Sequence, residues 1–171
     1  MNLSNLDHFA LLSRLPDEEK AAFAARCARQ AVQILKGMSF PVAPADQADL
    51  ERVVRLAEEA ATRHVDSAEL KRALRDLGHL AFTSPSIHDF QSDVLVSHVA
   101  HAVYAAGLTA LTGSTAYAQD TLDYAMKAAR AAGAADTEAL IREGLHRMRK
   151  VPAHSAPSRP VAHGLRPALL V

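Results

Sequence analysis

The chain has very little of what many functional classes require. It contains one cysteine, Cys27, no tryptophan, three tyrosines and five phenylalanines in 171 residues. A single cysteine excludes an intramolecular disulfide and a zinc site built from several thiolates. No aromatic residues are interleaved with the five basic residues after Gly144, so this basic end offers no platform for stacking nucleic-acid bases. The 19 basic residues are balanced by 19 acidic ones, which argues against general nucleic-acid binding.

Several functional motifs are also missing. The sequence contains no GxSxG nucleophile elbow, no P-loop, no GxGxxG and no HExxH. Its first residues do not show the basic region and apolar core of a signal peptide, and no apolar run reaches 18 residues without interruption. We therefore expect a cytoplasmic protein that has no enzymatic activity, needs no cofactor and contacts neither membrane nor nucleic acid.

What the sequence does contain favours helices. Alanine, leucine and valine dominate the 49% hydrophobic content, and alanine is the best helix former because it loses no side-chain entropy on ordering. We predict an all-α fold, a single-domain bundle or orthogonal array of six to seven helices around a buried central helix. This helical domain spans residues 1–150. Residues 151–171 form a Pro-rich C-terminal tail that is extended or disordered on its own.

Apolar periodicity and capping signals set the expected helix limits. Pro16 followed by three acidic residues predicts one helix start, and Asp66 with Glu69 three residues later predicts another. We expect Tyr124 and Leu140 to face the core from the last two helices. In chain order, the predicted helices cover residues 4–14, 16–36, 46–64, 66–81, 92–111, 115–132 and 136–150.

The stretch 92–111 is apolar nearly all the way round, so we expect it to be the buried axis of the domain. Its polar residues follow each other at steps of four, four and three and share one face, with His98 beside them: Asp93, Ser97, His101 and Tyr104. We interpret this seam as an internal polar network. A contact face for a partner and a catalytic stripe with Ser97 and His101 as nucleophile and base are the alternatives, and catalysis is the least favoured.

Three pairs of potential metal ligands occur at helical spacing: His98 with His101, Glu143 with His146, and Asp76 with His79. A di-iron carboxylate bundle needs two ExxH pairs and two further glutamates, and this chain has one ExxH pair. We therefore expect no metal site, with a metal-dependent helical enzyme as an alternative. Cys27 lies on an apolar helix stripe and is predicted to be a small buried hydrophobe.

The end of the chain differs from the rest. Residues 151–171 include four prolines, and the five basic residues after Gly144 are accompanied by no acidic one. A tail of this kind can dock in a groove on a larger partner. The short apolar segment that ends it supplies the predicted docking residues: Leu165, Arg166, Leu169, Leu170 and Val171.

Two segments carry a resemblance to a known family. The first is Cys27-Ala28-Arg29 leading to Ile34-Leu35, followed by a proline loop and a helix opening near Asp46. The second is His101-Ala102-Val103, followed by Asp123-Tyr124-Ala125-Met126-Lys127-Ala128-Ala129. Over residues 21–132 the chain resembles the Ala-rich, all-α immunity proteins of bacterial polymorphic toxin systems. In that family's pattern a second histidine follows the first by six positions, whereas this chain has Gly107 there.

The resemblance implies that the chain binds and neutralises a cognate toxin, with no catalysis and no cofactor. His101 is the one residue that we match to a motif position of the family. We therefore expect a non-enzymatic binding protein of immunity or antitoxin type. The alternatives are an adaptor or cargo protein that docks through its tail, and the metal-dependent enzyme. Small residues of the central helix favour tight internal packing, with a homodimer seam as the alternative: Ala100, Ala102, Ala105, Ala106, Gly107 and Ala110.

Overall fold

The computed structural model describes residues 5–38, 42–62, 66–82 and 90–149. In these ranges the chain forms seven α-helices and no strand, which confirms the all-α prediction. The helices are α1 (Asn5–Leu12), α2 (Asp17–Lys36), α3 (Pro44–Ala60), α4 (Ser67–Phe82), α5 (Phe90–Thr112), α6 (Thr115–Ala131) and α7 (Ala135–Arg149).

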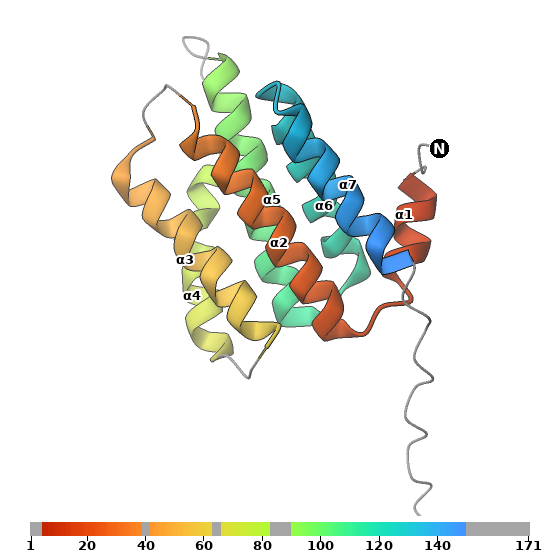
Figure 1. Ribbon diagram of the computed structural model, residues 1–171. Helices are drawn as coiled ribbons and strands as arrows, with labels where there is room; N and C mark the ends of the chain where they lie inside the picture. The colour runs from red at the N-terminus through yellow and green to blue at the C-terminus, as the bar shows by residue number, and fades with distance from the viewer. Residues whose placement is uncertain (1–4, 39–41, 63–65, 83–89, 150–171) are drawn as a thin grey trace, which may run out of the picture.

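Helix α5 is the central element of the bundle. It contacts α2, α3, α4 and α6. Figure 1 shows α2 crossing in front of α5, with α3 and α4 on one side and α6 and α7 on the other. Helix α1 packs against α6, and α7 packs against both α2 and α6. The two sides of the molecule are therefore joined mainly through α2 and α5.

Small side chains lie inside the bundle on both of these central helices. Alanines that are fully buried occur along each one: Ala24, Ala28 and Ala31 in α2, and Ala100, Ala102 and Ala106 in α5. The separation of two packed helices depends on the size of the side chains between them, so alanines permit a close approach. Larger core side chains fill the remaining space, among them Phe23, Leu50, Leu77 and Leu122. The small residues of α5 thus serve internal packing, as predicted.

Local signals determine where the helices begin and end. Asp66 Oδ1 accepts a hydrogen bond of 2.8 Å from the backbone N–H of Ala68, so it caps α4 as predicted. Gly113 and Gly133 both have φ of +65°, a left-handed conformation that ends α5 and α6. Helix α3 begins at Pro44, two residues before the predicted start at Asp46. Proline fits the first helical turn because the N–H that it lacks would have had no partner there.

The prediction that Leu140 faces the core is wrong. Leu140 is 55% exposed, whereas Ile141 and Leu145 of the same helix are buried. Helix α7 lies at the margin of the bundle, so only a narrow stripe of it is covered. Tyr124 is half-buried and packs against the edge of the core, where its ring stacks on His101 of α5. The predicted tail docking residues lie outside the described residues, and their role stays a prediction: Leu165, Arg166, Leu169, Leu170 and Val171.

The apolar character of α5 also meets one test for a membrane span. Among the described residues, Ser92–Thr112 is the one helical stretch long and apolar enough, by length and composition, to cross a membrane. Half of its most apolar window is buried inside the bundle. A central helix covered by its neighbours has the same composition, so this stretch carries no argument for a membrane.

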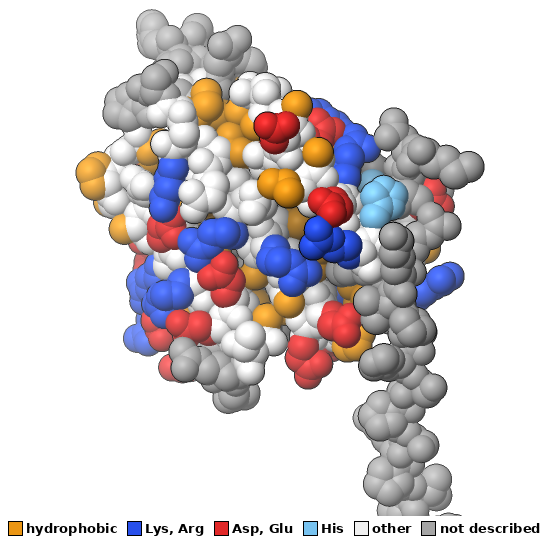
Figure 2. Space-filling view, viewed as in Figure 1, with side chains coloured by type: hydrophobic (Ala, Val, Ile, Leu, Met, Phe, Trp, Pro, Cys, Tyr) orange, Lys and Arg blue, Asp and Glu red, His pale blue; other side chains and the backbone are white. Residues whose placement is uncertain are grey.

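An ion network joins α2 to α3. The Arg29 guanidinium donates two hydrogen bonds to Glu58, of 2.9 and 2.7 Å, and a third to Glu51. Glu51 also pairs with Lys36, whose Nζ lies 2.6 Å from its carboxylate. Figure 2 shows acidic and basic side chains interspersed over this face of the molecule. Because the opposite charges neutralise each other here, we do not regard this face as a charged binding site.

Replacing Glu51 by glutamine is expected to cost about 1 kcal/mol of unfolding free energy at neutral pH. The pKa of Glu51 is lowered, first by the hydrogen bond from Lys36 and then by Arg29. A carboxyl group with a lowered pKa stabilises the fold above its ordinary pKa and loses this effect as the pH falls through its folded-state pKa. Urea unfolding at about pH 7 and about pH 3 measures the difference. A Glu51→Gln penalty of equal size at both pH values would contradict this account.

Candidate functional site

The polar seam of α5 lies on a partly open face of that helix. Its four residues are all half-buried: Asp93, Ser97, His101 and Tyr104. Two apolar residues at the same helical spacing, Leu108 and Leu111, continue this face toward the end of α5. The seam is therefore a half-buried strip between α4 and α6, and its interpretation as an internal polar network stays a prediction.

Four aromatic rings meet across this strip, and we call them the aromatic cluster. His101 stacks on Tyr124 of α6, with ring centroids 4.6 Å apart and an interplanar angle of 20°. Phe82 of α4 makes edge-on contacts with His101 and Tyr104, at centroid distances of 5.5 and 5.1 Å. Phe82 is nevertheless 66% exposed. Stacked and edge-to-face contacts favour defined ring orientations, so the cluster presents a rigid aromatic surface to solvent.

The edge of the cluster on α6 carries a positive charge. Lys127 Nζ lies 4.4 Å from the centroid of the Tyr124 ring, a cation–π contact. His98 lies close by, with its ring 6.0 Å from that of Tyr124. The pKa of His98 is lowered, first by burial and then by repulsion from Lys127 and His101. A lowered pKa favours the neutral imidazole, so His98 contributes a polar but uncharged group.

Ser97 and His101 are neighbours, but their hydrogen bonds do not make them nucleophile and base. His101 Nδ1 lies 2.8 Å from the backbone carbonyl oxygen of Ser97. Because a carbonyl oxygen can only accept, Nδ1 carries the proton in this bond. The same nitrogen lies 3.4 Å from Ser97 Oγ, and it cannot take up the hydroxyl proton while it donates to the carbonyl. This contact orients the ring on its helix.

The three pairs of potential metal ligands do not come together. Glu143 accepts a hydrogen bond from the next turn of α7, and Asp76 lies 3.5 Å from Arg52. His79 Nε2 lies 3.1 Å from Asp46 of α3. Within the described ranges, no group of three or more His, Cys, Asp or Glu side chains is placed to hold a metal ion. In this part of the chain, no cluster of potential metal ligands supports the alternative of a metal-dependent enzyme.

A groove of about 870 Å³ lies beside the aromatic cluster, between α4 and α5. Its floor is apolar, with Leu74 from α4 and Leu108 and Leu111 from α5. Basic residues of α4 form its rim: Lys71, Arg72 and Arg75. Tyr104 belongs to both the groove and the cluster. We therefore treat the aromatic cluster and the groove as one surface, the α4–α5 face.

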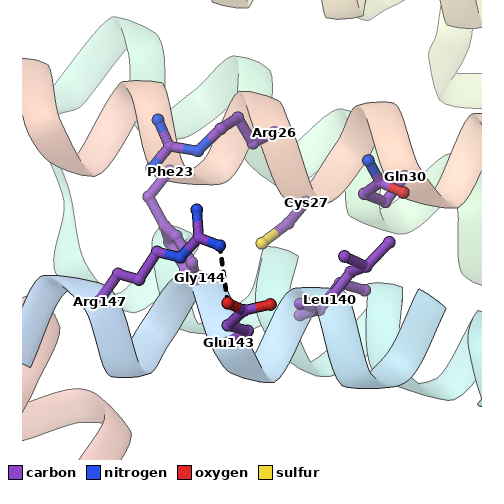
Figure 3. A pocket seen from close by; sticks show the side chains of 9 residues that line it. Phe23, Arg26, Cys27, Gln30, Leu140, Glu143, Gly144 and Arg147 are labelled. Carbon is purple, nitrogen blue, oxygen red and sulfur yellow. Dashed lines mark hydrogen bonds and ion pairs between the residues drawn. The ribbon is translucent and has the colours of Figure 1, made fainter. Parts of the chain in front are cut away.

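A second hollow, of about 560 Å³, lies between α2 and α7. Figure 3 shows Cys27 Sγ pointing from α2 toward α7, near the ion pair between Arg147 and Glu143. Burial raises the pKa of Cys27 to about 12. The thiol is therefore protonated at neutral pH, and it is the thiolate that acts as nucleophile or metal ligand. Cys27 is 3% exposed, which confirms the prediction of a buried residue.

Comparisons with known proteins do not add to this description. No protein-family model matches the chain, and no curated protein or solved structure shows a significant match. The α4–α5 face must therefore be interpreted from its own chemistry, which is rigid aromatic rings, an apolar groove and basic side chains.

Sequence reasoning found the α5 part of this face but missed the parts from α4 and α6. It assigned Tyr124 to the core and gave Phe82 no role. The missing signal lies in α4, where Lys71, Arg75 and Phe82 follow each other at steps of four and seven and so share one side of the helix. This side adjoins the seam of α5, so the two helices supply one surface.

Proposed function

We propose that this chain is a non-enzymatic binding protein of immunity or antitoxin type, which neutralises a cognate toxin by direct protein–protein binding. The observation that carries the proposal is Phe82, which is 66% exposed while its ring contacts His101 and Tyr104. Exposed apolar groups that gather in a patch commonly mark interaction sites. We infer that the α4–α5 face is the toxin-binding surface.

The chemistry of this face favours a protein partner. Its aromatic side chains offer a large contact area, and because their rings are already held, they lose little rotamer freedom when a partner covers them. Tyrosine and arginine, which both occur here, are the residue types enriched in interface hot spots. The apolar floor of the groove can receive a side chain of the partner and exclude water from it.

The resemblance to immunity proteins supplies the kind of partner. His101 is the motif position that this resemblance carries over, and it lies in the middle of the aromatic cluster, in contact with both Phe82 and Tyr124. The resemblance and the exposed surface therefore point to the same part of the molecule. This agreement supports toxin neutralisation over the adaptor alternative, which depends on the tail.

The direct test is co-expression with the product of the adjacent gene, since toxin and immunity proteins are usually encoded together. We expect relief of growth inhibition and a stable stoichiometric complex on size-exclusion chromatography. Continued growth inhibition together with the absence of a complex would refute the proposal.

Removing residues 151–171 separates binding by the helical domain from binding by the tail. We expect the shortened chain to hold the partner with unchanged affinity, because the proposed surface lies on α4, α5 and α6. Calorimetric titration gives the affinity, and a melting curve controls for folding. Lost binding at an unchanged melting temperature would favour the adaptor alternative with docking through Leu165–Val171. A lowered melting temperature would show that the tail packs on its own domain.

A further inference from the structure

On α4, Lys71 and Arg75 lie on a different side of the helix from the carboxylates, and Arg72 lies between the two sides. The carboxylates of α4 face α3, where Glu69 lies 3.9 Å from both Arg52 and Arg55, and Asp76 lies 3.5 Å from Arg52. The basic residues of α4 line the groove toward α5 instead: Lys71, Arg72 and Arg75. The acidic side of α4 is therefore neutralised by α3, and the basic side borders the apolar floor.

The three basic residues of the rim have no acidic partner in the described part of the chain. All three are exposed, and none forms an ion pair there. The basic residues between α2 and α3 differ, since Glu58 and Glu51 neutralise Arg29, and Glu51 also pairs with Lys36. Three unpaired positive charges within two turns produce a local positive potential. An acidic ligand would meet this potential next to an apolar floor.

The floor of the groove has the length and spacing of a helix contact. Tyr104, Leu108 and Leu111 follow each other at steps of four and three along α5, and Leu74 of α4 lies opposite them. The stretch from residue 104 to residue 111 is about 10 Å long at 1.5 Å per residue, which is two turns. An amphipathic helix presents an apolar stripe of this kind at i, i+3, i+4 and i+7. Within the described ranges there is no strand whose edge could pair with an extended peptide.

We propose that the α4–α5 groove binds an acidic amphipathic helix of a partner protein. The apolar side chains of that helix lie on the groove floor, and its carboxylates pair with Lys71, Arg72 and Arg75. This inference rests on the proposed function, because it assigns the chemistry of the partner segment that the α4–α5 face receives. A nucleic acid would satisfy the basic rim but would leave Leu74, Leu108 and Leu111 without an apolar partner, so we favour the helix.

The test uses the full chain and a fluorescein-labelled helical peptide of about 16 residues, long enough to hold a helix once bound. The peptide has leucines at i, i+3, i+4 and i+7 and glutamates on both flanks. We expect saturable binding by fluorescence anisotropy. Raising NaCl from about 0.1 M to about 1 M shortens the Debye length from about 10 Å to about 3 Å, so the affinity is expected to fall by about tenfold or more. A peptide with lysines in place of the glutamates is not expected to bind.

The double variant Lys71→Glu/Arg75→Glu is expected to weaken binding of the glutamate peptide by about tenfold or more, because two attractive contacts become repulsive. The matched control is Arg14→Glu/Arg26→Glu. It makes the same change in net charge at two exposed arginines outside the groove that also lack an ion pair among the described residues. We expect the control to bind like the unmodified chain, and circular dichroism verifies that both variants are folded.

The outcomes separate this inference from the proposed function. No binding of the glutamate peptide, or equal binding by the groove variant, overturns the inference, whereas a complex with the adjacent gene product still supports the proposed function. Weaker binding by the Arg14 and Arg26 control would place the site at the α2–α7 hollow and would also overturn it. The inference is also overturned if a DNA duplex binds through Lys71 and Arg75 more tightly than the peptide does. A homodimer that light scattering detects in the unmodified chain and not in the groove variant would likewise overturn the inference.

Discussion

Replacing Gly107 by histidine is expected to destabilise the fold by about 2–5 kcal/mol, whereas Gly107→Ala changes its stability by less than about 1 kcal/mol. A Cβ atom at this position would lie 2.7 Å from Leu74 Cδ2 and 3.2 Å from Val53 Cγ1. A single methyl group needs only a small shift of the Leu74 side chain, and alanine gains helix propensity over glycine. An imidazole has no space between α5 and its neighbours α3 and α4, and no polar partner among these aliphatic groups.

Gly78 provides the matched control for this prediction. It lies in the interior of α4, and a Cβ atom there would meet nothing within 4 Å. Gly78→Ala and Gly78→His are therefore expected to leave the fold as stable as before or to stabilise it slightly. Urea unfolding of the four variants gives the free energies. If Gly107→His proves as stable as Gly78→His, the close approach at Gly107 does not limit the size of that residue.

This packing also explains the position at which the proposed resemblance to immunity proteins breaks down. A second histidine six positions after His101 would stand at Gly107, where Leu74 and Val53 occupy the space that it needs. The contact of α5 with α3 and α4 therefore admits only a small residue at position 107. A related bundle could hold a histidine here only with smaller residues at positions 53 and 74. The difference at this position therefore reflects core packing, and His101 lies on another side of α5, where its ring contacts Phe82 and Tyr124.

The sequence was sufficient to predict the helices because their limits depend on local chemistry. Asp66 caps α4 through its own side chain, and Gly113 and Gly133 end helices by adopting a conformation that other residues avoid. Whether a side chain is buried depends instead on which neighbouring helix covers that side of its own helix. Leu140 has the same spacing as a core residue, but α7 lies at the margin and only the stripe with Ile141 is covered.

The candidate site was harder to predict for the same reason. Periodicity correctly placed His101 and Tyr104 on one face of α5, but it could not show that this face is left partly open. Tyr124 and Phe82 join the face through contacts between helices that are distant in sequence. The apolar character of α5 favoured a seam buried on every side, which the observed arrangement of α4 and α6 does not provide.

Replacing Phe82 by alanine is expected to weaken the complex with the proposed toxin by about 30-fold or more, the effect of an interface hot spot. Its ring is the most exposed aromatic group of the cluster, and its edge-on contacts with His101 and Tyr104 hold it in place. Loss of these two contacts costs the isolated protein about 1–3 kcal/mol of stability. Affinity by calorimetric titration and stability by urea unfolding must therefore both be measured.

Leu140→Ala is the matched control, because Leu140 is a large apolar residue with a similar exposure of 55%. It belongs to α7, which lies on the other side of the bundle from α4 (Figure 1). We expect Leu140→Ala to leave the affinity unchanged. If Leu140→Ala weakens the complex and Phe82→Ala does not, the toxin binds near α7 and the α2–α7 hollow. If neither does, the exposed aromatic cluster is not part of the interface. Only selective loss in Phe82→Ala agrees with binding through the α4–α5 face, because the two substitutions remove apolar groups of comparable exposure from different helices.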